Sequence, residues 1–408
     1  MKKNIKLFLS PILLAAVIGV SFGIKLYLIL KYNNKLTLSS DDINYVKSAI
    51  TLIKSGTLTY QNFNEPTVFI MPLYPIFLAA VFKIAGYGFW GLQGARIIQA
   101  LISCGAILFV YFTAKKLFDN KTAILAAILY AFYVPNITTS GYFLTETLFS
   151  FLLIALIYIS LIFMEAPSKL KFAALGVLWA IITLCRPTIA LFPVFLLVHC
   201  LLNRFKFLYL IKLFTALSFS FIIIMSAWWI RNYKEYNEFI PLSAASGNPM
   251  LQGTYVDYVQ TPQNIVYYKI GKNAFETNKA EMATAKMRIK TEFKKDFWGY
   301  LNWYTVKKTI QLWRSAFYWK EFLDISKKSV LIIHYILLIG IPGLIYCFIK
   351  NYKKHFLLIS IILYFNITHC IYMAFDRYAF PLMSILSIYC AYLLIKSLSN
   401  LKYLVLNK

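Results

Sequence analysis

Long apolar runs dominate this sequence of 408 residues. A helix needs roughly 20 mostly apolar residues to cross a bilayer, and ten segments reach or approach that length. These segments are 7–30, 95–114, 121–140, 144–163, 170–185, 187–203, 207–229, 329–349, 355–374 and 379–397. Hydrophobic residues make up 60% of the chain, well above the roughly 45–50% usual in soluble domains. The sequence therefore predicts an all-α integral membrane protein with about ten transmembrane helices.

The basic residues indicate how these helices are oriented. The chain carries 42 Lys and Arg against 16 Asp and Glu. With the N-terminus in the cytoplasm, the inside loops and the tail contain Lys115, Lys116, Lys121, Lys169, Lys171, Arg204, Lys206, Lys212, Lys350, Lys353, Lys354, Lys396, Lys402 and Lys408. This arrangement follows the positive-inside rule. Topology and anionic lipid thus account for the charge, and we expect no nucleic-acid binding.

Two longer stretches lie outside in this topology, namely residues 31–94 and residues 230–328. Within the second stretch, residues 273–303 alternate charged with apolar and aromatic residues at roughly helical spacing, which predicts helices on the outer leaflet. Surface helices are expected in the first stretch as well. The last three spans occupy residues 329–408, and we interpret residues 1–408 as a single polytopic membrane domain.

Charged side chains near the span ends gather on the outer side. They are Asp41, Asp42, Glu65, Arg96, Glu146, Arg186, Arg231, Asp376 and Arg377, whereas the inner side carries almost only lysine. A single charge at a helix end is usually an interfacial anchor, but anchors alone would place mixed charges on both sides. A transporter would more naturally carry ionisable groups near the bilayer midplane. The pattern favours a functional site that opens at the outer membrane surface.

Two adjacent acids, Asp41 and Asp42, are the candidate catalytic residues. A carboxylate can remove a proton from an attacking hydroxyl, and the arginine fork suits phosphate. Together they describe group transfer from a phosphate-bearing lipid. One base is then sufficient, because phosphate leaves as an anion that cations stabilise, unlike the leaving group in glycoside hydrolysis. We interpret Asp41 as the base and Asp42 as a helix cap or substrate ligand; two structural N-caps are the alternative.

Seven segments, in order along the chain, resemble a known group of membrane enzymes. They are DDINYVKSAITLIKSG, MPLYPIFLAAVFKIAG, GARIIQALISCGAILFVYFTAKKLF, LTETLF, LCRP, WWIRNYKEYNEFIPLSAASGNPMLQG and FDRYAFPL. The series is similar to the GT-C membrane glycosyltransferases, in the branch of the aminoarabinose transferases and protein O-mannosyltransferases (glycosyltransferase family 39). The resemblance implies a polyprenyl-phosphate-linked sugar donor, an acceptor outside the cytoplasm and inversion at the anomeric carbon.

The same resemblance implies roles for individual residues. Asp41 matches the first acid of the family's Asp-Glu/Asp-x-x-Tyr motif, which is its catalytic base, and Asp42 and Tyr45 fill the second and last positions. The candidates for substrate binding are Tyr45, Glu146, Arg186, Arg231, Asn232, Arg377 and Tyr378. Of these, Arg231 and Arg377 are expected to contact the carrier phosphate.

The resemblance does not extend to the identity of the sugar or to a metal. Met71 replaces a Pro that is common in the family, and no Lys or His stands just before it as in both branches. The outer carboxylates could bind a divalent cation through oxygen ligands, but no spacing requires one. The six cysteines lack the close spacing of metal sites and are interpreted as small core residues.

The sequence therefore predicts a multi-pass membrane glycosyltransferase whose active site faces the extracytoplasmic side. Its acceptor is a glycan, a lipid or a protein. A transporter or flippase of lipid-linked sugars is one alternative, since it would hold phosphate with the same arginines. A membrane assembly subunit without activity is the other. A change at Asp41 separates the three, because only the enzyme should lose sugar transfer.

Overall fold

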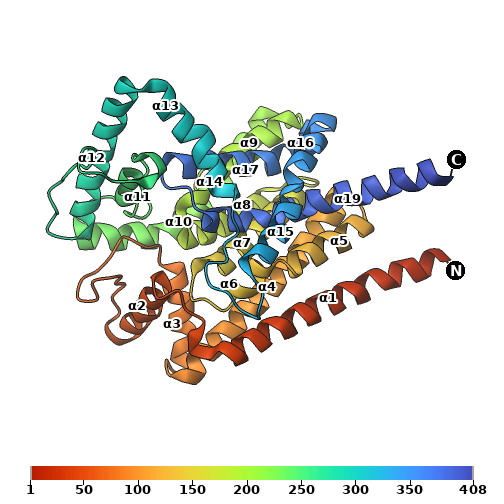
Figure 1. Ribbon diagram of the computed structural model, residues 1–408, viewed down its shortest axis with the longest axis horizontal. Coiled ribbons are helices and arrows are strands. Elements are labelled where there is room, and N and C mark those ends of the chain that lie inside the picture. Colours follow the sequence, from red (N-terminus) through yellow and green to blue (C-terminus); the bar gives the residue numbers. More distant parts are fainter. Residues whose placement is uncertain (1, 407–408) are drawn as a thin grey trace.

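The computed structural model describes the backbone of residues 2–406 and the side chains of residues 10–400. Throughout this part of the chain the secondary structure is helical, without a β-strand. The start of α1 (Lys2–Tyr32) and the end of α19 (Met383–Leu406) lie at the same end of the bundle (Figure 1). The predicted all-α fold is confirmed.

Seven helical segments among the described residues are long and apolar enough to cross a membrane. They are Ser10–Lys35, Phe89–Leu117, Thr145–Phe163, Phe207–Tyr236, Lys327–Lys350, Tyr352–Ile371 and Asp376–Asn400. They correspond to α1, α4 (Phe89–Leu117), α7 (Thr145–Phe163), α10 (Phe207–Tyr236), α15 (Lys327–Leu338) with α16 (Gly340–Lys350), α17 (Tyr352–Ile371), and α18 (Asp376–Ala379) with most of α19. The chain is a multi-pass membrane protein.

The other three predicted spans contain shorter helices. The first is divided into α5 (Asn120–Ala131) and α6 (Val134–Thr139), and the others hold α8 (Lys169–Cys185) and α9 (Phe192–Leu202). Pro135 lies in the first turn of α6, and proline inside a continuous helix would remove one backbone hydrogen bond and clash with the preceding turn. Pro187 separates α8 from α9, and Arg186 before it is extended because proline disfavours the helical conformation of the preceding residue. The predicted count of ten spans is therefore not confirmed.

Close packing of α8 against α10 depends on Gly176. A Cβ atom there would lie 2.0 Å from the carbonyl oxygen of Leu217 and 2.2 Å from Oγ of Ser220. The Ser220 hydroxyl donates a hydrogen bond across this contact to the carbonyl of Ala173 at 2.7 Å. Helix α8 also packs on α7. Since a short connection makes these two helices antiparallel neighbours, the start of α7 and the end of α8 come together.

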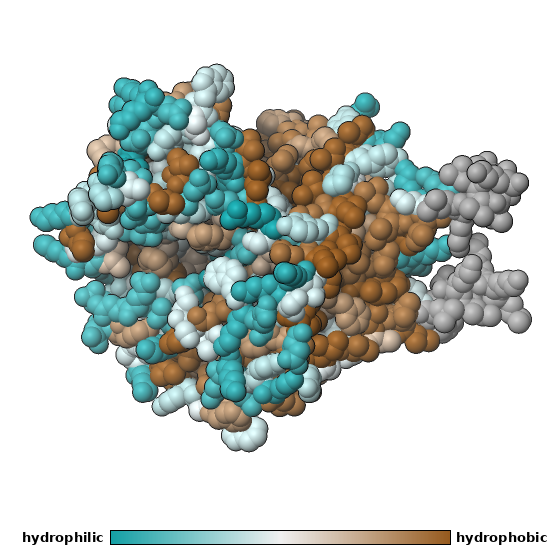
Figure 2. Space-filling model, viewed as in Figure 1, coloured by the Kyte–Doolittle hydropathy of each residue, from teal (hydrophilic) through white to brown (hydrophobic). Residues whose placement is uncertain are grey.

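The hydrophilic part of the molecule lies at the end of the bundle opposite the chain termini. Residues 31–94, the first stretch predicted to lie outside, contain α2 (Asp41–Ser55) and α3 (Leu73–Ala85). Residues 230–328, the second, contain α11 (Gly247–Gln252), α12 (Ala274–Lys295), α13 (Phe297–Asn302) and α14 (Lys308–Trp313). Hydrophilic residues gather over these elements, while hydrophobic residues cover much of the bundle (Figure 2). Helices α12 and α13 confirm the helices predicted at 273–303; their position on a membrane surface stays a prediction.

A buried lysine fastens α14 to the end of α17. Nζ of Lys308 donates hydrogen bonds to the carbonyl oxygens of Cys370 and Tyr372, at 2.9 and 2.8 Å. Burial lowers the pKa of Lys308 to about 7. Because α18 follows Tyr372 within a few residues, this contact helps to fix the position of Arg377.

Candidate active site

Helix α2 carries Asp41 and Asp42 in its first turn. Ser40 is the N-cap, and acidic residues are favoured after it because the helix macrodipole is positive at the N-terminus. The helix ends at Gly56, whose φ of +71° is the left-handed conformation that glycine adopts readily. The sequence therefore places Asp41 at a fixed helix start.

Asp42 orders the loop that precedes α2. Its buried carboxylate accepts hydrogen bonds from the backbone N–H groups of Leu38 and Ser40, both at 2.9 Å, and from the hydroxyl of Thr37. These two N–H groups flank Ser39, whose φ of +54° is uncommon for a residue with a Cβ atom. The contacts favour a structural role for Asp42 over a catalytic one.

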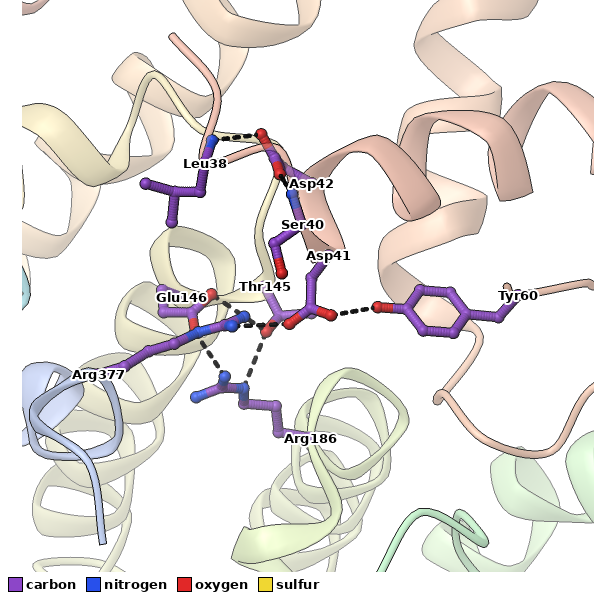
Figure 3. Close-up of polar contacts among 9 residues, drawn as sticks. All are labelled: Leu38, Ser40, Asp41, Asp42, Tyr60, Thr145, Glu146, Arg186 and Arg377. Atoms are coloured by element: carbon purple, nitrogen blue, oxygen red, sulfur yellow. Dashed lines mark hydrogen bonds and ion pairs between the residues drawn. The ribbon is translucent and has the colours of Figure 1, made fainter. Parts of the chain in front are cut away.

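Asp41 is held by two donors from distant parts of the chain (Figure 3). Its Oδ1 accepts a hydrogen bond from the phenol of Tyr60 at 2.7 Å, and its Oδ2 pairs with Nη1 of Arg377 at 2.7 Å. An ionised carboxylate has about four lone-pair sites. Two donors therefore leave room on Asp41 for a hydrogen bond from a substrate.

Glu146, in the first turn of α7, holds two arginines. Its Oε1 pairs with Nε of Arg377 and with Nη2 of Arg186 at 2.6 Å. Arg186 follows the last residue of α8, and its Nε donates to Oγ1 of Thr145 at 2.8 Å. We call Asp41, Tyr60, Glu146, Arg186 and Arg377 the Asp41 cluster. The cluster joins α2, α7, α18, the residue after α8 and the loop after α2, and its two guanidinium groups are held by side chains of α2 and α7.

Solvent exposure separates the two carboxylates of the Asp41 cluster. The side chain of Asp41 is 37% exposed, whereas that of Glu146 is 0% exposed. A general base must reach the proton that it removes, and only Asp41 meets this condition. A buried charge is costly unless it is paired, and Arg186 and Arg377 provide that pairing for Glu146. The position of Glu146 suits it to hold the arginines rather than to contact a substrate.

Aromatic rings pack around Asp41. Tyr45 lies against Tyr60 and Tyr74, with ring centroids 5.4 and 5.0 Å apart, and Tyr60 stacks on Phe69. Burial, and after it the nearby Tyr45 and the Asp41 carboxylate, raise the pKa of the Tyr60 phenol. Tyr60 therefore stays protonated and donates to Asp41. The predicted residue Tyr45 thus contributes packing beside the cluster.

Tyr378 borders the same cluster. Its ring stacks on His369 with a centroid distance of 4.6 Å, and the guanidinium carbon of Arg186 lies 6.0 Å from the ring centre of Tyr378. Tyr378 is next to Arg377 in α18. It is therefore placed where it can shape the space beside both arginines.

Arg231 and Asn232 lie outside the Asp41 cluster. Arg231 donates from Nη1 to the carbonyl of Thr67 at 2.7 Å and from Nη2 to the carbonyl of Leu58 at 3.4 Å. The amide of Asn232 donates to the carbonyl of Ile240 at 3.1 Å. Among the described side chains, Arg231 forms no ion pair with a carboxylate. The contacts of Arg231 connect the segment between α2 and α3 to the end of α10.

The described residues contain no group of three His, Cys, Asp or Glu side chains that could hold a metal ion. The carboxylates of Asp41 and Glu146 are engaged by arginines instead. All six cysteines are buried, which agrees with their interpretation as core residues.

Comparison with known proteins identifies the fold. The family model for dolichyl-phosphate-mannose-protein mannosyltransferases matches residues 65–230. No protein of curated function matches the sequence significantly. Among solved structures, ArnT from Cupriavidus metallidurans, bound to undecaprenyl phosphate, has a TM-score of 0.57 at 14% identity; the match covers 93% of this chain and 59% of ArnT.

An oligosaccharyltransferase from Archaeoglobus fulgidus is also similar. Its complex with zinc and sulfate has a TM-score of 0.53 at 12% identity, covering 95% of this chain and 50% of the other. A structure of the same enzyme, AglB, in complex with an inhibitory peptide and a dolichol-phosphate has a TM-score of 0.50 at 12% identity, with 96% and 51% covered. This chain thus spans between half and three fifths of the length of these neighbours.

The predicted resemblance is therefore confirmed. The chain has the fold of the GT-C membrane glycosyltransferases, and its residues 65–230 carry the sequence pattern of the dolichyl-phosphate-mannose-protein mannosyltransferase family.

Proposed function

We propose that this protein is a membrane glycosyltransferase that moves a sugar from a polyprenyl-phosphate carrier to an acceptor outside the cytoplasm. The observation that carries the proposal is the Asp41 cluster, in which a partly exposed carboxylate pairs with Arg377 and a buried glutamate holds Arg377 together with Arg186. This arrangement combines a general base with cations suited to phosphate. A fold shared with proteins bound to undecaprenyl phosphate and dolichol-phosphate supports the choice of donor.

In the proposed reaction, Asp41 removes the proton of an acceptor hydroxyl. The acceptor oxygen bonds to the anomeric carbon of the sugar as the bond from that carbon to the phosphate oxygen breaks. The electron pair of the broken bond stays with the carrier phosphate, whose charge Arg377 and Arg186 stabilise. A single displacement of this kind inverts the anomeric configuration.

The remaining residues act through Asp41, Arg186 and Arg377. Tyr60 orients Asp41 by its hydrogen bond to Oδ1. Glu146 fixes the planes of both arginines, and Thr145 adds a second contact to Arg186. Asp42 and Arg231 order the first outer stretch, so we assign them positioning roles. A divalent cation is not required by this scheme.

The direct test of this function is transfer from a synthetic polyprenyl-phosphate sugar by the purified protein. The sugar is chosen by comparing the cell-envelope glycans of cells with and without the gene. A sugar unit found only in cells with the gene identifies the transferred group. We expect the purified protein to release polyprenyl phosphate only when the polyprenyl-phosphate sugar and the acceptor are both present. Movement of the intact donor across liposomes, without transfer, would support a flippase instead.

The proposal also requires the Asp41 cluster to face away from the cytoplasm. Ser39→Cys and Glu238→Cys should react with a membrane-impermeant thiol reagent in intact cells, whereas Lys121→Cys and Lys353→Cys should react only after permeabilisation. The background lacks the six native cysteines, all of which are buried. The reverse labelling pattern would contradict both the orientation and the extracytoplasmic acceptor.

A further inference from the structure

A cleft of about 530 Å³ opens at the end of the bundle opposite the Asp41 cluster. It is lined by Lys116, Leu117, Leu161, Met164, Glu165, His199, Asn203, Phe205, Asn351, Lys353 and Lys354. Glu146 and Glu165 lie at opposite ends of α7, a helix of 19 residues, which at a rise of about 1.5 Å per residue separates them by roughly 28 Å. The cleft is thus a second feature, remote from the proposed chemistry.

The charges around this cleft do not balance. Its lining holds three lysines and one acid, and the acid, Glu165, is paired with Lys116. Lys353 and Lys354 form no ion pair with any described carboxylate. Two positive charges therefore remain in a concave site, where an anion would gain attraction from both.

The start of α17 adds to this positive potential. Asn351 is the N-cap, and its side chain accepts a hydrogen bond from the N–H of Lys354. The first turn contains Lys353 and Lys354 and no acid, although helix N-termini favour negative charge and bind anions through free N–H groups. Lysines at this position are therefore unfavourable for the isolated helix and become favourable once an anion binds.

One ring nitrogen of a buried histidine in the wall of the cleft has no hydrogen-bond partner among the described residues. His199 is 4% exposed, and its Nδ1 is unpaired among the described side chains. Asn203, one helical turn later, donates from its amide to the carbonyl of His199 and also to that of Lys353. Membrane topology accounts for exposed lysines on this side, but it does not account for a cleft with an unpaired buried imidazole nitrogen.

We propose that this cleft binds the phosphate of an anionic phospholipid headgroup. Lys353, Lys354 and the N-terminus of α17 receive the phosphate, and Leu161, Met164 and Phe205 supply apolar contact for the adjoining glycerol and acyl groups. The position suits a lipid because the cleft lies at the ends of membrane-spanning helices, where basic pockets between helices bind such headgroups. This site does not depend on the proposed glycosyltransferase activity.

The test compares lipid binding by the full-length protein and a charge variant. Purified, delipidated protein in detergent is titrated with dioleoylphosphatidylglycerol, and bound lipid is measured by native mass spectrometry. The double variant Lys353→Gln/Lys354→Gln should bind about 25-fold more weakly, because each basic residue near an anionic lipid surface contributes roughly a fivefold factor. The matched control, Lys121→Gln/Lys212→Gln, removes the same charge from exposed positions at the same end and should bind as the parent does.

Two further ligands distinguish an anionic lipid from a neutral lipid and from a soluble phosphate ion. Dioleoylphosphatidylcholine carries a phosphate without net negative charge and should bind weakly to all three proteins. Inorganic phosphate tests for a soluble anion; if it displaced the lipid at comparable concentrations, the assignment to a lipid would be wrong. Equal loss of lipid binding in the test and control variants would show that only overall charge matters, and would overturn the site.

Discussion

Asp41→Asn should reduce sugar transfer by about a hundred- to ten-thousand-fold, the range expected when general-base assistance is lost. Asparagine keeps the size of the side chain and can still accept a hydrogen bond from Tyr60 or Arg377, but it cannot take a proton from the acceptor. Transfer from a synthetic polyprenyl-phosphate sugar is the measurement. Melting temperature and expression should stay near those of the parent, because Asp41 is partly exposed and its two partners remain.

Asp42→Asn is the matched control for this prediction. Its amide would place donors where the carboxylate now accepts from Leu38, Ser40 and Thr37. We expect a loss of about 1–3 kcal/mol in the free energy of unfolding, with the residual folded protein still active. Near-normal transfer by Asp41→Asn, with collapse of transfer in Asp42→Asn at unchanged stability, would assign the base to Asp42. Normal transfer by both variants would end the proposed mechanism.

Arg377→Lys should lower transfer by roughly ten- to a hundredfold, which corresponds to the loss of one hydrogen bond between charged groups, about 1.5–3 kcal/mol. Lysine keeps the charge but cannot present two N–H groups in one plane. It therefore cannot contact Asp41 and Glu146 together, as Nη1 and Nε of Arg377 do. The transfer rate is measured at saturating and at limiting donor concentrations, because loss of a phosphate contact should lower both kcat and kcat/KM for the donor.

Arg231→Lys provides the comparison for Arg377→Lys. Arg231 contacts the backbone carbonyls of Thr67 and Leu58 and lies outside the Asp41 cluster. We expect its replacement to lower thermal stability more than transfer by the folded protein. If the Arg231 variant lost transfer at unchanged stability while the Arg377 variant kept it, the carrier phosphate would have to be held at Arg231.

Hydropathy predicts the positions of most of the apolar helices, but it does not predict their lengths. The run at 121–140 is long enough to span a bilayer, yet Pro135 divides it into α5 and α6. Burial against neighbouring helices permits such a break, because a backbone that is covered by protein does not need the regular hydrogen bonding that lipid demands. A hydropathy average over neighbouring residues in the sequence does not show which segments are covered by other helices.

Which side chains lie together could be predicted in part for the charged residues and not for the uncharged ones. Asp41, Glu146, Arg186 and Arg377 belong to the nine charged residues predicted near the outer span ends and match motifs of the resembling family, and the structure brings these four together. Tyr60 is one of 30 tyrosines, so no local pattern marks it as the partner of Asp41. Arg231 has the same sequence setting as the other arginines, and only the tertiary structure decides that its partners are backbone carbonyls.

The pairing of Asp41 with Arg377 has a consequence for biosynthesis. The two residues are 336 positions apart, so at a synthesis rate of about 5–20 residues per second the first waits roughly 20 to 70 seconds for the second. Glu146 and Arg186, only 40 positions apart, can meet much earlier. A nascent chain that already spans the membrane can thus hold one of the three ion pairs of the Asp41 cluster, and the other two form only after Arg377 has been synthesised. A ribosome that stalls before Arg377 would leave an inserted chain in which Asp41 lacks its ion-pair partner and Glu146 pairs with Arg186 alone.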